Sequence, residues 1–198
     1  DRSRGLGDVY KRQLHRVRAL AQKHPDWTFC SYTAAVIYGL SVSHANLTHI
    51  HIAVAPAQST TPGSQVVRHR YVRQTRATQM DIAVTDIDQT ITDCLVDASF
   101  VEGLIIADSA LHEQLLSKEH LVETVDKLGL NRRGVVTARS VARCADGLSE
   151  SGGESKARAL MIERGWQTPE LQIELFDPVE PGRPYRVDYL WRVGDRLI

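Results

Sequence analysis

The residues best suited to chemistry lie in the last third of the chain, on three successive expected elements. Glu154 falls in the first turn of an expected helix, Gln172 in an expected strand, and Asp188 in a second strand between Val187 and Tyr189. A carboxylate inside a strand is expensive to bury unless a metal or a partner balances its charge. Oxygen ligands of this kind hold Mg²⁺ beside a phosphate. The chemistry they suggest is metal-dependent phosphodiester hydrolysis.

A structural explanation for the same residues stays open. Asp188 could pair with Arg186 or Arg192 on its own strand face, two or four residues away. Ser151 and Glu154 stand in the S-x-x-E relation of a capping box, which satisfies backbone amides at a helix start. A nuclease site also needs at least one further acid, and none follows Asp195.

Three histidines offer a second candidate metal site. His49 and His51 share one face of an expected strand, and His69 lies in the strand expected to pair with it. No cysteine or acid has the spacing to supply a fourth ligand. The alternative is that these side chains form the polar outer face of a half-buried sheet.

Basic residues mark candidate DNA contacts. Arg68, Arg70 and Arg73 alternate along one expected strand, and Lys156 and Arg158 lie on the expected helix that contains Glu154. Such residues can contact phosphates, each adding salt-dependent affinity. They can equally form a solvated face or a charged edge strand that resists aggregation.

Composition excludes several classes of protein. Lys plus Arg and Asp plus Glu both total 24 in 198 residues, so there is no bulk attraction to nucleic acid or anionic lipid. The three cysteines are far apart and lack metal-binding or disulfide spacing, which is typical of a reducing compartment. No run approaches the roughly 18 apolar residues of a membrane span. We therefore expect a cytoplasmic protein without membrane contact.

The periodicity of apolar residues predicts an α/β (α+β) fold, with a small, mostly antiparallel sheet followed by a helical layer. A helix starting at Leu14 ends before Pro25, and Ser31 is expected to cap a short helix that stops at Gly39. Residues 47–54 and 65–72 are expected to pair as an antiparallel hairpin, and residues 80–83 to add a strand. Expected helices cover residues 87–98, 101–116, 118–127, 132–145 and 151–164, and Ser117 is expected to cap the third of them. Expected strands at 171–176, 185–191 and from 196 onward complete a helix-plus-strands module.

Asp93 and Asp97 lie one helical turn apart in the first of these later helices. Paired acids at this spacing can serve catalysis, but a second helix with Asp108 follows. We expect the pair to cap or brace the helical layer.

Several blocks of the chain together resemble a known family. These blocks are residues 31–40, 51–54, 67–70, 91–97, 107–111, 149–158, 165–172 and 186–191. The blocks before residue 149 are similar to the AbiEi-type antitoxin region of actinobacterial proteins. The later blocks are similar to the Vsr-like endonuclease domain, of PD-(D/E)XK type, that follows that region.

The resemblance implies an antitoxin-like α/β region over residues 14–148 and the first part of a nuclease domain over residues 149–198. Residues 1–13 resemble a translated sequencing adaptor and are expected to be non-native. The resemblance assigns Asp188 as a metal ligand and Glu154 and Gln172 as supporting catalytic positions. It also implies Mg²⁺ as cofactor, DNA as partner and a possible cognate toxin.

The chain departs from the family at both ends. A DNA-binding winged helix should precede residue 31, and an acid-x-acid strand should follow Ile198. We therefore expect a fragment truncated at both ends, with an incomplete restriction-endonuclease-like module that neither retains Mg²⁺ nor cuts DNA. A non-catalytic regulator or protein-interaction module is the alternative.

Overall fold

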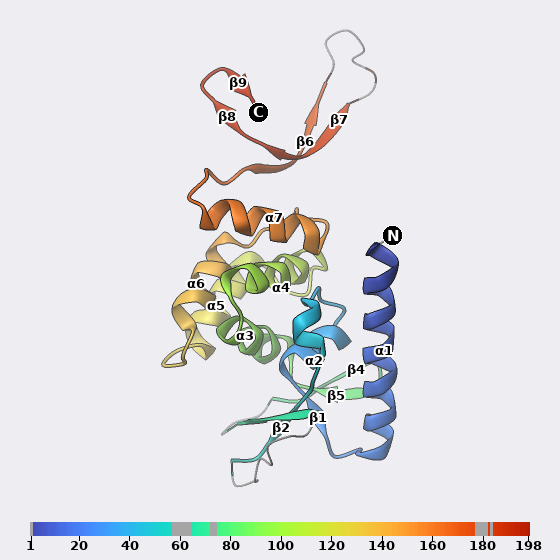
Figure 1. Ribbon diagram of the computed structural model, residues 1–198. Coiled ribbons are helices and arrows are strands. Elements are labelled where there is room, and N and C mark those ends of the chain that lie inside the picture. Colours follow the sequence, from blue (N-terminus) through green and yellow to red (C-terminus); the bar gives the residue numbers. More distant parts are fainter. Residues whose placement is uncertain (1, 57–64, 72–74, 177–181, 183) are drawn as a thin grey trace.

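A mixed sheet, a stack of helices and two hairpins follow one another along the chain (Figure 1). The computed structural model describes residues 2–56, 65–71, 75–176, 182 and 184–198, and for residues 2–8 it describes the backbone alone. The α+β class predicted from the sequence is confirmed. Among the described residues, no helix combines the length and the apolar character needed to cross a membrane.

The first part of the chain builds the sheet and the two helices that pack on it. Its elements are α1 (Arg2–Lys23), β1 (Thr28–Phe29), α2 (Ser31–Ile37), the 3-10 helix η1 (His44–Leu47), β2 (Ile50–Val54), β3 (Val66–Arg70), β4 (Ala77–Gln79) and β5 (Ile82–Val84). The strand order is β3-β2-β1-β5-β4. The alternation of residues 50–54 predicts the buried face correctly, since Ile50, Ile52 and Val54 pack with Val17 of α1.

The sheet is mixed, and the expected antiparallel pairing of residues 47–54 with 65–72 is wrong. β2 and β3 run parallel, with Ile50 opposite Val66 and Val54 opposite Arg70. β1 is antiparallel to β2 and parallel to β5. Alternation with period two is the same for both strand directions, so it identifies the buried face and leaves the direction open.

Two local expectations in this region are also corrected. The strand expected at residues 80–83 is a hairpin of β4 and β5, whose two-residue turn is Met80-Asp81 with φ of 51° and 62°. Ser31 does not cap α2, because Cys30 is the N-cap residue and Ser31 is buried inside the helix start with φ 48°. Gly39 does end this segment in the left-handed region, at φ 85°.

Helix α1 begins at Arg2, well before the expected start at Leu14. Two residues before Leu14 make polar contacts that apolar periodicity does not detect. The Tyr10 hydroxyl donates a hydrogen bond to the Val42 carbonyl oxygen (2.7 Å), and Gln13 Nε2 donates to the His49 carbonyl oxygen (3.2 Å). These polar contacts fix the helix against the loops that precede and follow η1.

The helical layer comprises α3 (Ile87–Asp97), α4 (Phe100–His112), α5 (Lys118–Leu128) and α6 (Val135–Cys144), and α7 (Gly152–Glu163) packs on α4. Ser117 and Ser151 cap α5 and α7 as predicted, each accepting a hydrogen bond from the backbone amide three residues on. Ala159 of α7 belongs to the same apolar core as α3 to α6. The first helix of the expected nuclease module is therefore packed onto the preceding region.

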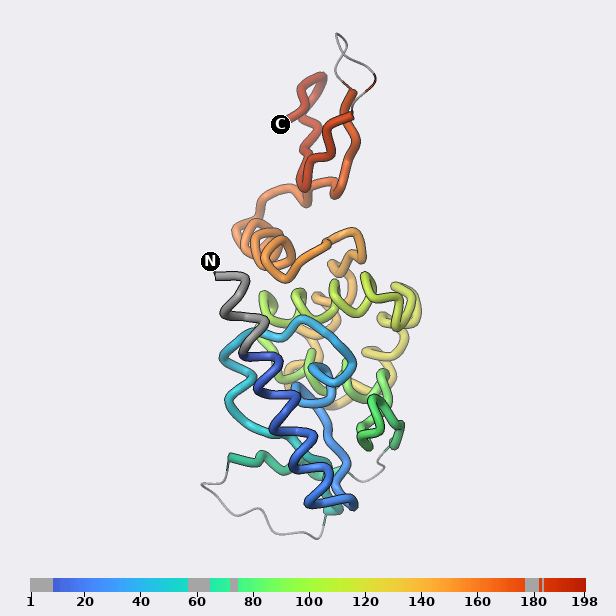
Figure 2. Tube along the Cα trace, turned by 90° about the vertical axis from the view of Figure 1, so that its right-hand side faces the viewer, coloured from blue at the N-terminus to red at the C-terminus, as the bar shows by residue number. Residues whose placement is uncertain are grey.

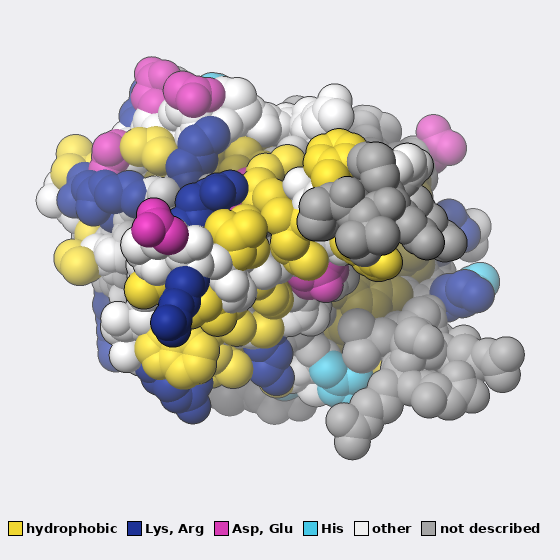
Figure 3. Space-filling view, turned by 90° about the horizontal axis from the view of Figure 1, so that it is seen from above, with side chains coloured by type: hydrophobic (Ala, Val, Ile, Leu, Met, Phe, Trp, Pro, Cys, Tyr) yellow, Lys and Arg dark blue, Asp and Glu magenta, His cyan; other side chains and the backbone are white. Residues whose placement is uncertain are grey.

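Two hairpins lie beyond α7, on the side away from the helical layer (Figures 1 and 2). β6 (Glu170–Leu175) and β7 (Tyr185–Leu190) pair antiparallel, and so do β8 (Arg192–Val193) and β9 (Arg196–Leu197). Seen from the hairpin end, hydrophobic side chains lie among Lys and Arg side chains (Figure 3). The exposed large hydrophobic residues of this part are Trp166, Phe176, Tyr185, Val193, Leu197 and Ile198.

Candidate functional site

The structure brings together the three residues predicted as the catalytic group. Gln172 Nε2 lies 3.3 Å from Glu154 Oε2 and 3.3 Å from Asp188 Oδ1, so one amide nitrogen bridges both carboxylates. Asp188 is exposed, whereas Glu154 and Gln172 are half-buried. The cluster therefore combines anchored side chains with one acid open to solvent.

The start of α7 fixes Glu154. The Ser151 hydroxyl accepts a hydrogen bond from the Glu154 amide (3.2 Å) and donates one to Glu154 Oε1 (2.6 Å). Glu154 Oε2 accepts from the backbone amide of Glu150 (2.9 Å). Glu154 is thus a capping acid, as the structural explanation held, and it also faces Gln172 and through it Asp188.

The antiparallel register of β6 and β7 positions the other two residues. Leu171 pairs with Tyr189 and Ile173 with Val187, which leaves Gln172 opposite Asp188. Gln172 adopts φ 53°, a left-handed conformation that costs of the order of 1 kcal/mol or more for a residue with a side chain.

The Gln172 amide is only half satisfied. Its Oε1 is buried and has no hydrogen-bond partner among the described residues, whereas its Nε2 has two. Strained backbone and an unsatisfied buried acceptor on one residue are features that cluster at functional sites.

Tyr189 lies beside the negatively charged groups of this cluster, and its pKa is affected by them. Its hydroxyl donates to the Glu154 carbonyl oxygen (2.7 Å) and so anchors β7 on the first turn of α7. Burial is the main cause that raises the pKa of Tyr189 to about 12, and the charges of Glu154 and Asp188 add to it. Composition offers no signal for this residue, because its role depends on the hairpin register.

The nearby arginines do not neutralise Asp188. Arg186 pairs with Glu150, with Nη2 2.9 Å from Oε1, and Arg192 pairs with Glu170, with Nε 2.7 Å from Oε1. The alternative in which Asp188 pairs with Arg186 or Arg192 is therefore wrong. Both arginines pair with acids on neighbouring segments, and Asp188 accepts a hydrogen bond from Gln172.

Of the predicted DNA-binding residues, Arg158 is buried and its prediction is wrong. Its side chain is 2% exposed and forms a bidentate ion pair with Asp108, with Nη2 2.7 and 2.6 Å from the two carboxylate oxygens. Arg158 Nη1 also donates to the Cys144 carbonyl oxygen (2.7 Å). The guanidinium joins α7 to α4 and α6 inside the protein, where it cannot contact the phosphates of DNA.

The remaining predicted DNA contacts lie apart from one another. Lys156 is exposed on α7, two residues after Glu154, so the two side chains do not share a helix face. Arg68 is half-buried and Arg70 exposed on β3, an edge strand of the sheet at the opposite end of the molecule from the hairpins (Figure 1). Arg73 lies outside the described residues.

The three predicted histidines do not converge. His51 Nδ1 and His69 Nε2 are 2.8 Å apart, while His49 Nδ1 lies 2.8 Å from the Thr48 hydroxyl. His51 is only 9% exposed, so it is not part of a polar outer face. Burial, followed by the charges of His69 and His49, lowers the pKa of His51 to about 4. Burial also lowers the pKa of His69, against the opposing charges of two aspartates on α3.

Asp93 braces the helical layer, as expected. It is 1% exposed and accepts hydrogen bonds from Gln89 Nε2 (2.9 Å), Arg132 Nη1 (2.6 Å) and the Tyr71 hydroxyl. The network ties the end of β3 to α3 and to the loop before α6. Asp97, in contrast, is exposed.

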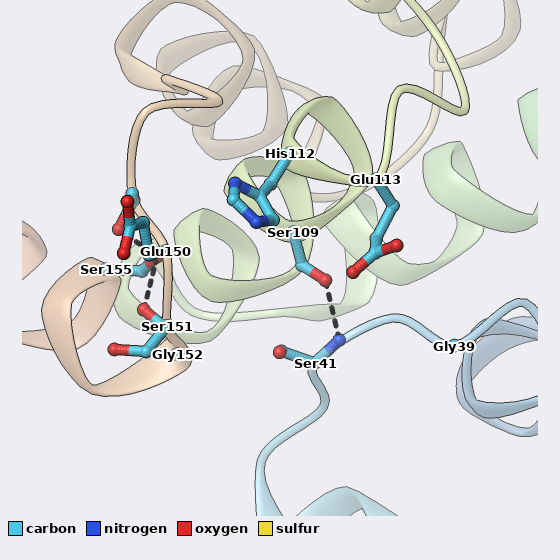
Figure 4. A pocket seen from close by; sticks show the side chains of 10 residues that line it. Gly39, Ser41, Ser109, His112, Glu113, Glu150, Ser151, Gly152 and Ser155 are labelled. Carbon is cyan, nitrogen blue, oxygen red and sulfur yellow. Dashed lines mark hydrogen bonds between the residues drawn. The ribbon is translucent and has the colours of Figure 1, made fainter.

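A small polar pocket of about 50 Å³ opens beside the start of α7 (Figure 4). Several of its hydroxyl groups already have partners, since Ser109 Oγ accepts from the Ser41 amide (2.9 Å) and the Ser149 and Ser155 hydroxyls lie 2.9 Å apart. His112 also lines the pocket, and no hydrogen bond joins it to a serine among these described residues. The pocket has room for about one or two waters and contains no activated nucleophile.

The described segments offer few side chains that are arranged to bind a metal ion. They contain no group of three or more His, Cys, Asp or Glu side chains arranged to hold a metal ion. The cluster of Glu154, Gln172 and Asp188 supplies two carboxylates and one amide. It can hold part of a coordination sphere, with water or a phosphate supplying the rest.

Comparison with known proteins finds two relatives, both from Mycobacterium tuberculosis and both named only as uncharacterized proteins, MT2308 and Rv2248. Each is 29% identical to the chain over 162 residues, which is 82% of this chain and 58% of the relative. The chain thus spans less than two thirds of the length of the curated relatives that it matches. No family model matches the chain, and no solved structure matches it significantly.

Proposed function

We propose that the chain is part of a DNA-acting bacterial protein of the cytoplasm, in which an antitoxin-like regulatory region precedes a Mg²⁺-dependent endonuclease-like module. The observation that supports the nuclease part is the cluster of Glu154, Gln172 and Asp188, in which one strained amide bridges two carboxylates. A cognate toxin for residues 14–148 is proposed on the sequence resemblance alone.

The donor set fits a hard cation. Gln172 Nε2 lies between the two carboxylates, where its N–H groups offset their negative charge. Turning the amide by 180° would direct its buried, unpartnered Oε1 toward the same point. Two carboxylates and an amide oxygen then face one position, and Mg²⁺ in nucleases keeps several waters besides such ligands.

The residues of the cluster would have different roles in binding the metal ion. Glu154 and Asp188 would hold the ion, and Gln172 would change from a hydrogen-bond donor to a ligand. When bound, Mg²⁺ supplies Lewis-acid stabilisation of a phosphate oxygen and lowers the pKa of a bound water. The capping hydrogen bonds of Glu154 and the Tyr189 hydroxyl keep α7 and β7 at a fixed separation. With Arg158 buried, Lys156 is the predicted DNA contact that remains exposed on α7.

Metal titration tests the proposal on the chain itself. Mn²⁺ binding, followed by the loss of the free-ion electron paramagnetic resonance signal, is expected at one site with only millimolar affinity, too weak for the chain to retain the metal during purification, because only part of the coordination sphere comes from protein. Asp188→Asn should remove this binding, and Asp195→Asn, in the exposed β8–β9 turn, should leave it unchanged. Equal Mn²⁺ affinity in wild type and Asp188→Asn would favour the non-catalytic regulator instead.

Plasmid cleavage gives a second readout. We expect no nicking by this chain with Mg²⁺ or Mn²⁺, because the described residues bring only two carboxylates to the cluster. Nicking that disappears in Asp188→Ala would show that the cluster is catalytically complete and would contradict this expectation.

A further inference from the structure

A basic groove lies where the ends of α4 and α6 meet the start of α5 and the buried side of α7. It has a volume of about 500 Å³, and a second hollow of about 400 Å³ adjoins it and shares Leu111, Lys118 and Gly147. Pockets of roughly 300–1,000 Å³ hold small organic ligands. None of the residues that line either hollow belongs to the cluster of Glu154, Gln172 and Asp188.

Lys118 stands at the junction of the two hollows. Its ammonium group donates to the carbonyl oxygens of Arg143 (2.7 Å) and Ala145 at the end of α6. An ammonium has three donors, so one N–H remains for a ligand. Among the described residues, no carboxylate lies within ion-pair distance of Lys118. Burial is the main cause that lowers the pKa of Lys118, and a bound anion would oppose that effect.

The other charges of the groove are also mostly positive. Arg143 is exposed and, within the part of the chain that the structure describes, forms no ion pair. Arg158 lines the inner wall, where its Nε is buried without a partner and its charge is balanced from behind by Asp108. Asp146 is the acid of the lining, and its Oδ1 is occupied by the Leu148 amide (2.9 Å).

We propose that this groove binds the phosphate group of a small phosphorylated molecule of the size of a nucleoside monophosphate. Lys118 and Arg143 supply two positive charges, which match a phosphate dianion better than a carboxylate. Leu111 and Ala145 provide an apolar wall for the rest of the ligand, and Thr168 adds a hydroxyl group.

The start of α5 is not the binding element. The Glu119 carboxylate accepts hydrogen bonds from its own backbone amide and from the Ser117 hydroxyl, and these lower its pKa. The start of α5 therefore already has the Glu119 carboxylate as its bound anion. The side chains of Lys118 and Arg143 remain as the source of selectivity.

Nuclear magnetic resonance of the full chain tests the proposal, with the backbone amides of Lys118 and Gly147 as reporters. Inorganic phosphate, acetate, AMP and adenosine are titrated at constant ionic strength. Phosphate and AMP should shift both reporter amides, AMP more tightly, while acetate and adenosine should bind at least about tenfold more weakly.

Variants separate the groove from general surface charge. Arg143→Gln should weaken phosphate binding about tenfold. Arg139→Gln, one turn earlier on α6 and paired with Asp126, should leave it unchanged. Lys118→Gln should abolish binding, but it also removes the hydrogen bonds to the end of α6, so the exposed Arg143 gives the decisive comparison. Unchanged phosphate affinity in Arg143→Gln, or equal affinity for acetate and phosphate, would overturn the proposal.

Discussion

Replacing Arg158 by Met tests whether this arginine is structural or contacts DNA. The substitution keeps most of the aliphatic stem and removes a guanidinium that gives Asp108 two hydrogen bonds and Cys144 one. Asp108 is fully buried and would retain the Asp146 amide, 2.8 Å from its Oδ1, and the Ser155 hydroxyl as its hydrogen-bond donors. An uncompensated buried carboxylate would then stand between α4 and α7.

The expected loss is large. Removing one partner of a buried ion pair costs about 3–5 kcal/mol. Burial already raises the pKa of Asp108 against the opposing charge of Arg158, so without that charge the pKa rises further and protonation limits the penalty. For a chain of 198 residues, 3–5 kcal/mol corresponds to a fall in Tm of roughly 6–20 °C.

Urea unfolding followed by circular dichroism measures the change in the free energy of unfolding. Lys156→Met is the matched control, since Lys156 is exposed on the same helix and should change stability by less than about 0.5 kcal/mol. The double variant Asp108→Leu with Arg158→Met should recover much of the loss, because both charges leave together. Equal stability of Arg158→Met and Lys156→Met would refute the structural role of the ion pair.

Two further predictions concern pH and backbone geometry. The pKa of His51 is lowered from 6.5 to about 4, so its stabilising contribution is complete above pH 6.5 and is lost as pH falls toward 4. The loss amounts to about 3 kcal/mol. The free energy of unfolding, measured by denaturation at pH 7 and at pH 4.5, should differ less between the two pH values in His51→Gln than in wild type. The exposed His15→Gln should show the same difference as wild type. Gly134→Ala should lower the free energy of unfolding by about 3 kcal/mol or more, because a Cβ at φ 83° would lie 2.0 Å from the Val96 carbonyl oxygen. Gly194→Ala, at φ 60° with nothing within 4 Å, should cost only about 1 kcal/mol, and comparable losses in the two variants would contradict the steric explanation.

Local signals in the sequence predicted much of the fold. The alternation of residues 50–54 gives the buried face of β2, and the serines at 117 and 151 give the starts of α5 and α7, because each signal depends on residues close together in the chain. Strand direction depends on where distant segments pack, so the parallel pairing of β2 and β3 has no local signature. The part of α1 just before Leu14 likewise makes polar contacts with loops more than 30 residues away.

In the candidate site, too, features that depend on distant contacts could not be predicted from the sequence. The resemblance to a nuclease family, and not residue chemistry alone, predicted that Glu154, Gln172 and Asp188 would meet, and the structure places both carboxylates beside the amide nitrogen of Gln172. The partner of Arg158 is 50 residues away on α4, and nothing beside Arg158 in the sequence distinguishes it from the exposed Lys156. The left-handed backbone of Gln172 is equally invisible, because Gln gives no turn signal.

The proposed metal site at Glu154, Gln172 and Asp188 is tested most directly at the side-chain amide of Gln172. Addition of Mn²⁺ to the chain labelled with ¹⁵N should broaden the Gln172 side-chain N–H₂ resonances before any other side-chain amide, and Asp188→Asn should abolish the effect. Broadening centred elsewhere, or persisting unchanged in Asp188→Asn, would show that these three residues do not form a metal site.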